Sequence, residues 1–263
     1  MSRLSQYLNR SSQVLRDGAS RVLRMAGADP QSRTPITLWT LNSREDIAQY
    51  ATGCDADVGG TSSVHLELDE RSARPDAGVL ALDPPRPHAK FWGEMRLAPR
   101  AGFEGKMRGG YAGFRNTHRT SLFGEITDDV SNHRYIALRV RVAGHPRTRN
   151  AYFVNIQTDG PVVTDLWQHR LFFAREDGGW EDVFIPFDDF VLTNMGEVQP
   201  NQIKMMKERI RTVGISMLGG KFGVEGNYEL GIDSIRAVNQ EDAMSSIPKA
   251  DPATNTRWQR QPV

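Results

Sequence analysis

Four acidic side chains stand within one short stretch, residues 180–193, which reads WEDVFIPFDDFVLT. Paired carboxylates can hydrolyse a glycosidic bond when they face each other across a sugar at roughly 5–9.5 Å. Adjacent side chains in a strand or turn point apart, so Asp188 and Asp189 do not form such a pair by themselves. Pro186 cannot donate to a sheet ladder and therefore marks an edge or the end of a strand. We interpret the stretch as a strand, a stop and an aromatic plug, Phe190.

A second group of acids lies in GCDADVGGTSSVHL, where Asp55 and Asp57 are two residues apart beside flexible glycines. This resembles a fragment of a calcium loop, but it lacks the Gly at position six and the Glu at position twelve of an EF-hand. Acids beside a turn more often cap it. The six histidines show no HxH or HExxH spacing, and the lone Cys54 excludes a multi-thiolate zinc site. We therefore predict no catalytic residue, no cofactor and no metal.

The composition narrows the function classes. The chain has 263 residues with 33 basic and 32 acidic side chains, and its net charge of +1 gives no reason to expect nucleic-acid binding. With a single cysteine there is no internal disulfide, as in a reducing compartment. No window approaches the roughly 20 apolar residues that a membrane span requires. We expect a protein that is soluble or at most lies on a membrane surface.

Residues 1–34 differ from the rest of the chain. The segment MSRLSQYLNRSSQVLRDGASRVLRMAG holds five arginines, five serines and one acid. Its apolar residues recur at helical spacing, at Leu4, Leu8, Leu15, Val22 and Ala26. This pattern predicts an amphipathic helix, and we expect the row Leu4, Leu8, Leu15 and Val22 to contact a partner or a membrane.

An arginine- and serine-rich, acid-poor amphipathic N-terminus is typical of a mitochondrial transit peptide. Two alternatives stay open: a helix retained as a surface anchor, and an ordinary helix packed on the domain. Gly18 weakens the helix by about 1 kcal/mol, which favours a segment that becomes ordered on contact.

After the breaker run GADPQSRTP, the apolar period changes from helical to two. In RYIALRVRV, Ile136, Leu138, Val140 and Val142 share one face. Further strands are expected in ITLWTL, SVHLELDE, AKFWGEM, GYAGFRN, AYFVNIQT, LFFARE, WEDVFIPF, TVGISML and NYELGIDSI. Many short strands separated by Gly/Pro/Asp loops predict an all-β sandwich or barrel over residues 35–240. Short helices are expected in REDIAQYA and PNQIKMMKERI, and residues 241–263 are expected to be a disordered tail.

Several of these blocks occur in a specific order. The order runs DADVGGTSSVHL, AKFWGEM, GYAGFRN, RYIALRVRV, AYFVNIQT, WEDVFIPFDDFVLTNMGEV, TVGISML and GNYELGIDSIRAV. Over about residues 35–240 it resembles the mitochondrial complex I intermediate-associated protein family, the assembly factors of NADH:ubiquinone oxidoreductase. Residues of the W-x-x-V-x-I/L-P-F-x-x-F block that match are Trp180, Val183, Pro186, Phe187 and Phe190. A long insertion before AKFWGEM and an extra Trp92 inside it depart from the family pattern.

The resemblance implies a jelly-roll sandwich like galactose-binding domains. It also implies a non-enzymatic chaperone that binds membrane-arm subunits of a complex I intermediate together with other assembly factors. The place implied is the matrix side of the inner mitochondrial membrane, and the arginine-rich N-terminus agrees with it.

Two functions of other classes remain as alternatives. A carbohydrate-binding module is suggested by the sandwich topology and by Trp39, Trp92, Trp167 and Trp180, although aromatic residues in strands more often belong to a core. A glycoside or metal hydrolase would need a catalytic constellation assembled across distance, and no motif indicates one.

Overall fold

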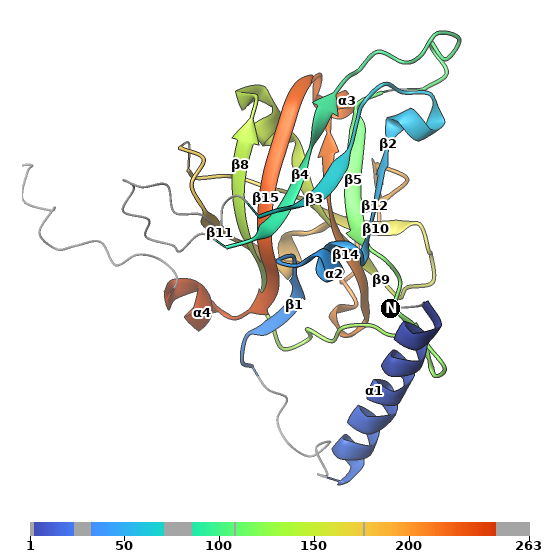
Figure 1. Cartoon of the computed structure of the whole chain (residues 1–263), viewed down its shortest axis with the longest axis vertical. Coiled ribbons are helices and arrows are strands. Elements are labelled where there is room, and N and C mark those ends of the chain that lie inside the picture. Colours follow the sequence, from blue (N-terminus) through green and yellow to red (C-terminus); the bar gives the residue numbers. More distant parts are fainter. Residues whose placement is uncertain (1–2, 24–32, 71–85, 108, 176, 246–263) are drawn as a thin grey trace, which may run out of the picture.

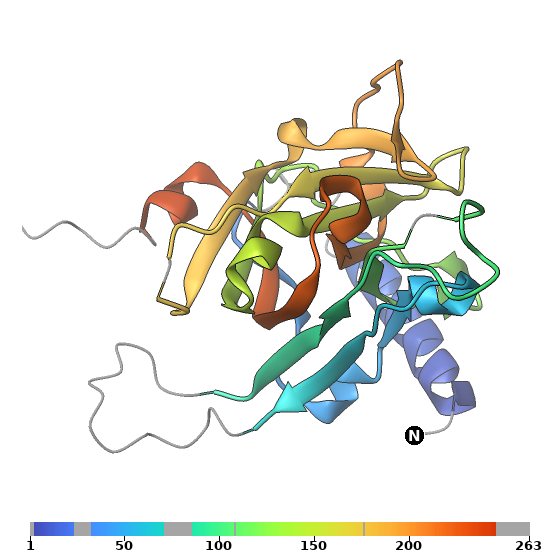
Figure 2. The same cartoon turned by 90° about the horizontal axis from the view of Figure 1, so that it is seen from above.

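A computed structural model describes residues 3–23, 33–70, 86–107, 109–175 and 177–245. Two antiparallel sheets lie face to face as two layers (Figures 1 and 2). The first sheet has the order β11 (Glu181–Pro186), β8 (Tyr135–Gly144), β15 (Gly226–Val238), β4 (His88–Met95) and β3 (His65–Asp69), with β1 (Ile36–Thr40) also paired to β15. The second has the order β13 (Glu197–Val198), β12 (Val191–Asn194), β10 (Asp165–Arg170), β9 (Tyr152–Thr158), β14 (Ile210–Leu218), β5 (Tyr111–Asn116) and β2 (Tyr50–Cys54). The predicted β-sandwich is confirmed.

The period-two pattern of the strands builds the core between these sheets. Ile136, Leu138 and Val140 of β8 are fully buried, because successive side chains of a strand point to opposite faces. At the centre, the ring of Phe91 on the first sheet lies 4.9 Å from that of Phe114 on the second. Such aromatic pairs contribute about 0.5–1.5 kcal/mol beyond the area they bury.

The stretch WEDVFIPFDDFVLT forms the strand, stop and plug that its residues predict. β11 is an edge strand that pairs only with β8 among the described strands, and Pro186 is its last residue. The chain then turns through a short 3-10 helix, η4 (Phe187–Asp189). Phe187 and Phe190 are 2% and 4% exposed, and their rings stack at 6.4 Å. The acids of this turn, Asp188 and Asp189, are exposed to solvent.

Two sequence predictions of local structure are wrong. LFFARE is not a strand in its described residues: β10 ends at Arg170 just before it, and the Leu171 amide makes one further bond to the carbonyl of Tyr152 at 2.9 Å while its side chain is buried. PNQIKMMKERI contains only a 3-10 turn, η5 (Lys207–Arg209). Its backbone is used in long-range bonds, since the carbonyl of Lys207 accepts from Val130 at 2.9 Å. Tertiary contacts override local helix propensity at this position.

The described helices are few. The predicted N-terminal helix is α1 (Arg3–Leu23), and REDIAQYA contains α2 (Arg44–Ile47), whose N-cap Ser43 accepts from the Asp46 amide at 3.1 Å. Other short helices are η1 (Asp55–Val58), η3 (Pro146–Ala151), α3 (Gly219–Phe222) and α4 (Gln240–Ser245). The predicted disordered tail thus begins, in its first residues, as helix α4; residues 246–263 lie outside the described residues.

Candidate binding surfaces

The acids of the opening stretch have structural partners. Asp182 pairs with Arg139 at 3.1 Å and with Arg236 at 2.7 Å across the first sheet. Glu181 accepts from the backbone amide of Ala174 at 2.9 Å and so closes a loop. Among the residues that the structure describes, no group of three or more His, Cys, Asp or Glu side chains is placed to hold a metal.

Asp55 and Asp57 cap a turn, as their positions predict. Asp55 is 2% exposed, and its carboxylate accepts from the amide and the hydroxyl of Ser62 at 2.9 and 2.8 Å. It also accepts from the amides of Gly110 and Tyr111. Asp57 accepts from the amide of Cys54 at 3.2 Å. The pair therefore organises loops at one end of the sandwich.

The outward face of the first sheet carries paired charges. Lys90 on β4 lies 3.1 Å from Glu229 on β15, and Arg141 on β8 lies 3.6 Å from Asp69 on β3. Beside them, the rings of Trp92 and His65 stack at 4.3 Å. The charged side chains of this face thus pair with each other, as is usual on a sheet surface exposed to solvent.

The four tryptophans that suggest a carbohydrate-binding module do not line one sugar-binding platform. Trp39 and Trp167 belong to the core, at 9% and 4% exposed. Trp92 donates to Glu67 at 2.9 Å, and Trp180 lies against His88 and Arg141. These residues therefore give little support to a carbohydrate-binding module.

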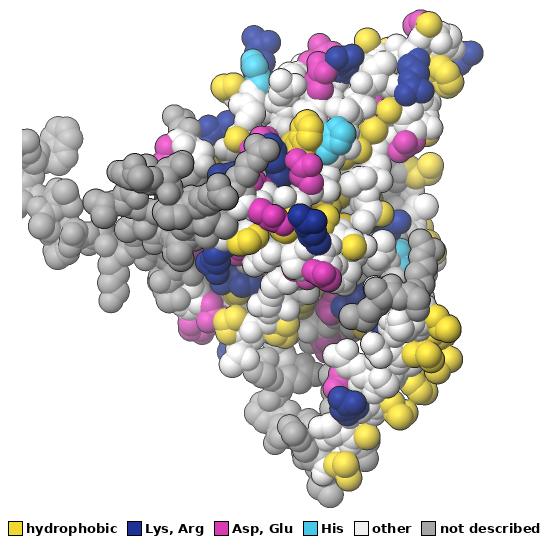
Figure 3. All heavy atoms as spheres, viewed as in Figure 1, with side chains coloured by type: hydrophobic (Ala, Val, Ile, Leu, Met, Phe, Trp, Pro, Cys, Tyr) yellow, Lys and Arg dark blue, Asp and Glu magenta, His cyan; other side chains and the backbone are white. Residues whose placement is uncertain are grey.

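Helix α1 leaves most of its leucine row uncovered. Leu4, Leu8 and Leu15 are 68%, 50% and 61% exposed. Figure 3 shows apolar side chains gathered on the surface in the lower part of the molecule, where α1 lies. Val22 lies in the same helix, but its side chain is outside the described residues. Two of these positions are one helical turn apart and the third is two turns further on, so they share a face. No described helix is both long and apolar enough to span a membrane.

The helix contacts the sandwich through a small hairpin, β6 (Thr120–Ser121) and β7 (Gly124–Glu125). Ser11, buried on the hairpin side of α1, accepts from the amide of Leu122 at 3.0 Å. The hairpin tip adds two more exposed apolar side chains, Leu122 and Phe123, at 64% and 61%. The helix and the hairpin tip together form what we call the apolar edge: Leu4, Leu8, Leu15, Leu122 and Phe123.

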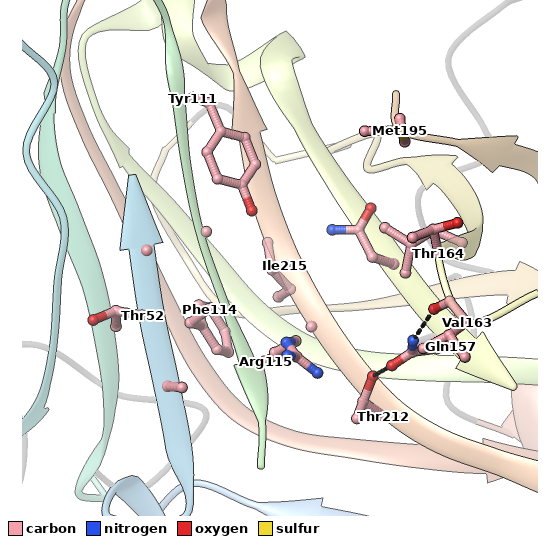
Figure 4. A pocket seen from close by; sticks show the side chains of 16 residues that line it. Thr52, Tyr111, Phe114, Arg115, Gln157, Val163, Thr164, Met195, Thr212 and Ile215 are labelled. Carbon is pink, nitrogen blue, oxygen red and sulfur yellow. Dashed lines mark hydrogen bonds between the residues drawn. The ribbon is translucent and has the colours of Figure 1, made fainter. Parts of the chain in front are cut away.

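A groove of about 460 Å³ lies on the outward face of the second sheet. Figure 4 shows Tyr111 and Arg115 on one side of it, with Gln157, Val163, Thr164 and Met195 on the other. β14 runs between the two sides and contributes the backbone of Gly214 to the floor. A Cβ atom at this glycine would lie 2.3 Å from the carbonyl oxygen of Phe114, so the floor has no room for a side chain. The volume is within the range of small-molecule binding sites.

One wall of the groove is built from side-chain amides. Asn155 donates to the hydroxyl of Ser216 at 2.9 Å and accepts from Gln168 at 2.7 Å. Gln157 donates to the carbonyl of Val163 at 2.6 Å. Because these residues alternate with buried residues of β9 and β10, the amides are held on one face by the strands beneath them.

The groove is not predicted by the sequence pattern. The signal was present in AYFVNIQT, where Asn155 and Gln157 alternate with core residues, but a polar outward face is ordinary for a strand. These positions form a wall of the groove because the neighbouring strand has a glycine, Gly214, beside them. Gly214 comes 59 residues after Asn155 in the chain. Only the pairing of β14 with β9 brings them together.

Comparison with known proteins decides the family. Residues 39–232 match the family model described as complex I intermediate-associated protein 30 (CIA30). The chain belongs to the CIA30 family. The match covers almost the whole sandwich, from β1 to β15, so family membership applies to the domain that carries the groove.

Two curated relatives carry the same name, "Complex I intermediate-associated protein 30, mitochondrial". The one from Neurospora crassa is 33% identical over 217 residues, which cover 79% of this chain and 75% of the relative. The one from Mus musculus is 24% identical over 225 residues, covering 82% of this chain and 61% of the relative. The CIA30 chain described here is thus similar to mitochondrial proteins of a fungus and a mammal, and its family supports a role in complex I assembly.

Among solved structures, the CIA30 sandwich is similar to a family 11 carbohydrate-binding module from Clostridium thermocellum, solved in complex with a β-1,3-1,4-mixed-linked tetrasaccharide. The TM-score is 0.50 at 13% sequence identity, with 80% of this chain and 98% of the module covered. At this identity the likeness establishes the fold alone: a two-sheet β-sandwich of the kind that carbohydrate-binding modules use.

Proposed function

We propose that this CIA30-family chain is an assembly factor of mitochondrial respiratory complex I that binds a membrane-arm intermediate and catalyses no reaction. The observation that carries the proposal is the family match over residues 39–232, together with 33% identity to a relative of that name. The structural partners of Asp55, Asp57 and Asp182 support the non-enzymatic part, since these carboxylates hold the chain together.

The chain acts on the matrix side of the inner membrane as a peripheral protein. Support comes from the mitochondrial names of both relatives and from α1, an amphipathic helix with several arginines and a single acid. A helix of this kind lies in a membrane interface with its apolar side chains buried and its basic side chains near anionic lipid. In this arrangement the apolar edge contacts the membrane, and the sandwich stands beside the assembling subunits.

Binding without catalysis suits a rigid sandwich. A protein that binds a subunit transiently needs a rigid scaffold and, on this scaffold, surfaces that recognise the partner. The apolar edge and the groove are two such surfaces. They lie on different parts of the domain, so the chain has the means to contact a membrane and a polypeptide at the same time.

Deletion of the gene tests the assembly function. In mitochondria of the deletion strain, native gel electrophoresis followed by immunodetection should show membrane-arm intermediates that stay unjoined and a loss of mature complex I. Re-expression of the full chain should restore complex I. A deletion strain with normal levels of complex I would refute the proposal.

Protease protection tests the location. In intact mitochondria and in mitoplasts the protein should resist external protease, and it should be released from membranes by alkaline carbonate as peripheral proteins are. Digestion in mitoplasts, in which the intermembrane space is open, would contradict the matrix-side location.

A further inference from the structure

The register of the second sheet places an unusual row of residues across five strands. Neighbouring residues in this row are Ala51, Arg115, Gly214, Asn155 and Gln168. Arg115 and Asn155 flank the glycine, so their backbones are two strand spacings apart, about 9–10 Å. The floor between them is bare backbone. This row summarises the groove: a cation lies on one wall, amides lie on the other, and no side chain lies between them.

The width of the groove favours one shape of occupant. A single extended chain fits between two walls that are two strand spacings apart. An α-helix with its side chains is about 10–12 Å across and is too wide to reach the floor. Beside Gly214, the β14 side chain that lines the groove, Thr212, is small and buried, so the floor stays low there.

The chemistry of the walls indicates a polypeptide. Asn155 and Gln157, which line the groove, carry the same amide group as a peptide backbone, which both donates and accepts hydrogen bonds. Among the described residues that line the groove, Arg115 is the only charged side chain. It is exposed, and one of its five N–H donors goes to His118 at 3.0 Å. A carboxylate on the occupant would complement this cation.

The rim of the groove is apolar and, at one point, strained. Met195 and Val163 are 86% and 63% exposed, although both line the groove. Met195 has φ of 50°, in a hairpin turn where Asn or Gly is the favoured residue. Non-glycine residues in this region cost of order 1 kcal/mol, and such strain gathers at functional sites. Exposed apolar side chains at a rim match the apolar side chains of a peptide better than the hydroxyl groups of a sugar.

We propose that the groove of Arg115, Gly214 and Asn155 binds one extended, mostly uncharged segment of a partner polypeptide that carries a carboxylate. The proposal rests on the assembly function and names the kind of segment that this surface recognises. The peptide lies along β14. Its backbone exchanges hydrogen bonds with the Asn155 and Gln157 side, its carboxylate meets Arg115, and its apolar side chains contact Met195 and Val163.

An array of overlapping 12-residue peptides tests this inference directly. The array covers the loops of the complex I membrane-arm subunits of the same organism, and it is probed with the full chain. Peptides that bind should be largely uncharged with one Asp or Glu, and fluorescence anisotropy then gives their affinities. If no peptide binds, or if only a β-glucan tetrasaccharide binds in a parallel titration, the inference is wrong.

Two variants and a matched control assign the binding to the groove. Asn155→Leu should weaken every binding peptide at least tenfold. Arg115→Gln should weaken a peptide with a carboxylate at least tenfold, yet leave its Asp→Asn or Glu→Gln counterpart unchanged. Asn227→Leu makes the same replacement at an exposed position on β15, away from the groove, and should leave affinity unchanged. Equal affinity of Asn155→Leu and the parent would overturn the inference.

The same variants separate this inference from the assembly function. Re-expressed in the deletion strain, Asn155→Leu should restore complex I less well than Asn227→Leu at equal protein levels. If the deletion strain lacks complex I and Asn155→Leu restores it fully, the groove is not needed for assembly. The assembly function itself would still stand.

Discussion

The buried carboxylate of Asp55 accepts two hydrogen bonds from Ser62, one from its amide at 2.9 Å and one from its hydroxyl at 2.8 Å. Gly60, between them in the chain, has no room for a side chain, because a Cβ atom there would lie 2.3 Å from Asp55 Cγ. The same carboxylate accepts from the amide of Gly110, so it joins the turn after β2 to the start of β5. The contacts of Asp55 with Ser62 and Gly110 thus stabilise the fold.

Asp55→Asn should lower the free energy of unfolding by about 2–4 kcal/mol. An amide keeps one accepting oxygen but turns an NH₂ group toward backbone N–H donors, which leaves buried donors unsatisfied. Chemical denaturation followed by tryptophan fluorescence measures the change. Asp57→Asn is the matched control: Asp57 is exposed and accepts one bond at 3.2 Å, so the loss there should stay below about 1 kcal/mol. Equal losses in the two variants would contradict the role given to Asp55.

Gly93→Ala should destabilise the sandwich by about 2–3 kcal/mol, because overpacking a close contact forces the backbone to move. A Cβ atom at Gly93 would lie 2.2 Å from the carbonyl oxygen of Ser63. Gly53→Ala makes the same change on β2, where the added atom meets only Asp57 at 3.8 Å. That variant should be neutral or up to about 1 kcal/mol more stable, since alanine restricts the unfolded chain. Thermal unfolding of both proteins checks the contrast.

Glu125→Gln should reduce stability in a pH-dependent way. Arg211 donates to the Glu125 carboxylate, from Nε at 2.9 Å, and this bond is the main cause that lowers the pKa of Glu125. A carboxylate with a lowered folded-state pKa stabilises the fold above its ordinary pKa of 4.5, and the benefit is lost as the pH falls through the lowered value. The parent should therefore exceed the variant by about 1–3 kcal/mol near neutral pH.

The pH series provides its own test. The difference in free energy of unfolding between parent and Glu125→Gln should be constant near neutral pH and shrink below about pH 4.5. Glu197→Gln, at an exposed position of β13, should show no such difference. A difference for Glu125→Gln that grows as the solution becomes acidic would have the wrong sign.

Replacement of Leu4, Leu8 and Leu15 together by Gln should leave the sandwich intact and weaken membrane binding. The three side chains are exposed, so the free energy of unfolding should change by less than about 0.5 kcal/mol. Each leucine buried in a membrane interface contributes up to about 1.5–3 kcal/mol, so flotation with vesicles of mixed neutral and anionic phospholipid should fall at least tenfold.

The other side of α1 supplies the control for this variant. Gln6, Asn9 and Gln13 are exposed on the polar side of the same helix, and their replacement by Ser should not change flotation. Added salt should reduce flotation of the parent, because the arginines of α1 attract anionic lipid. Flotation of the leucine variant equal to that of the parent would exclude α1 as the membrane contact.

The local order of side chains is enough to predict much of this protein. Alternation in RYIALRVRV predicts a half-buried strand and β8 confirms it, because neighbouring side chains of a strand point to opposite faces wherever the strand lies. The helical spacing of Leu4, Leu8 and Leu15 likewise predicts α1, whose exposed row agrees with it. The order of the motif blocks along the chain is by itself sufficient to indicate the CIA30 family, and the family match over residues 39–232 confirms it.

Other features depend on which segments meet, and these only the tertiary structure decided. Residues 200–209 have a helical pattern, yet long-range bonds, such as that from the Val130 amide to the Lys207 carbonyl, hold part of them in another conformation. The groove has the same origin: Arg115, Gly214 and Asn155 form one row because β5, β14 and β9 pair in a particular register. Sequence patterns specify the face of each side chain, whereas register between distant strands specifies its neighbours across the sheet.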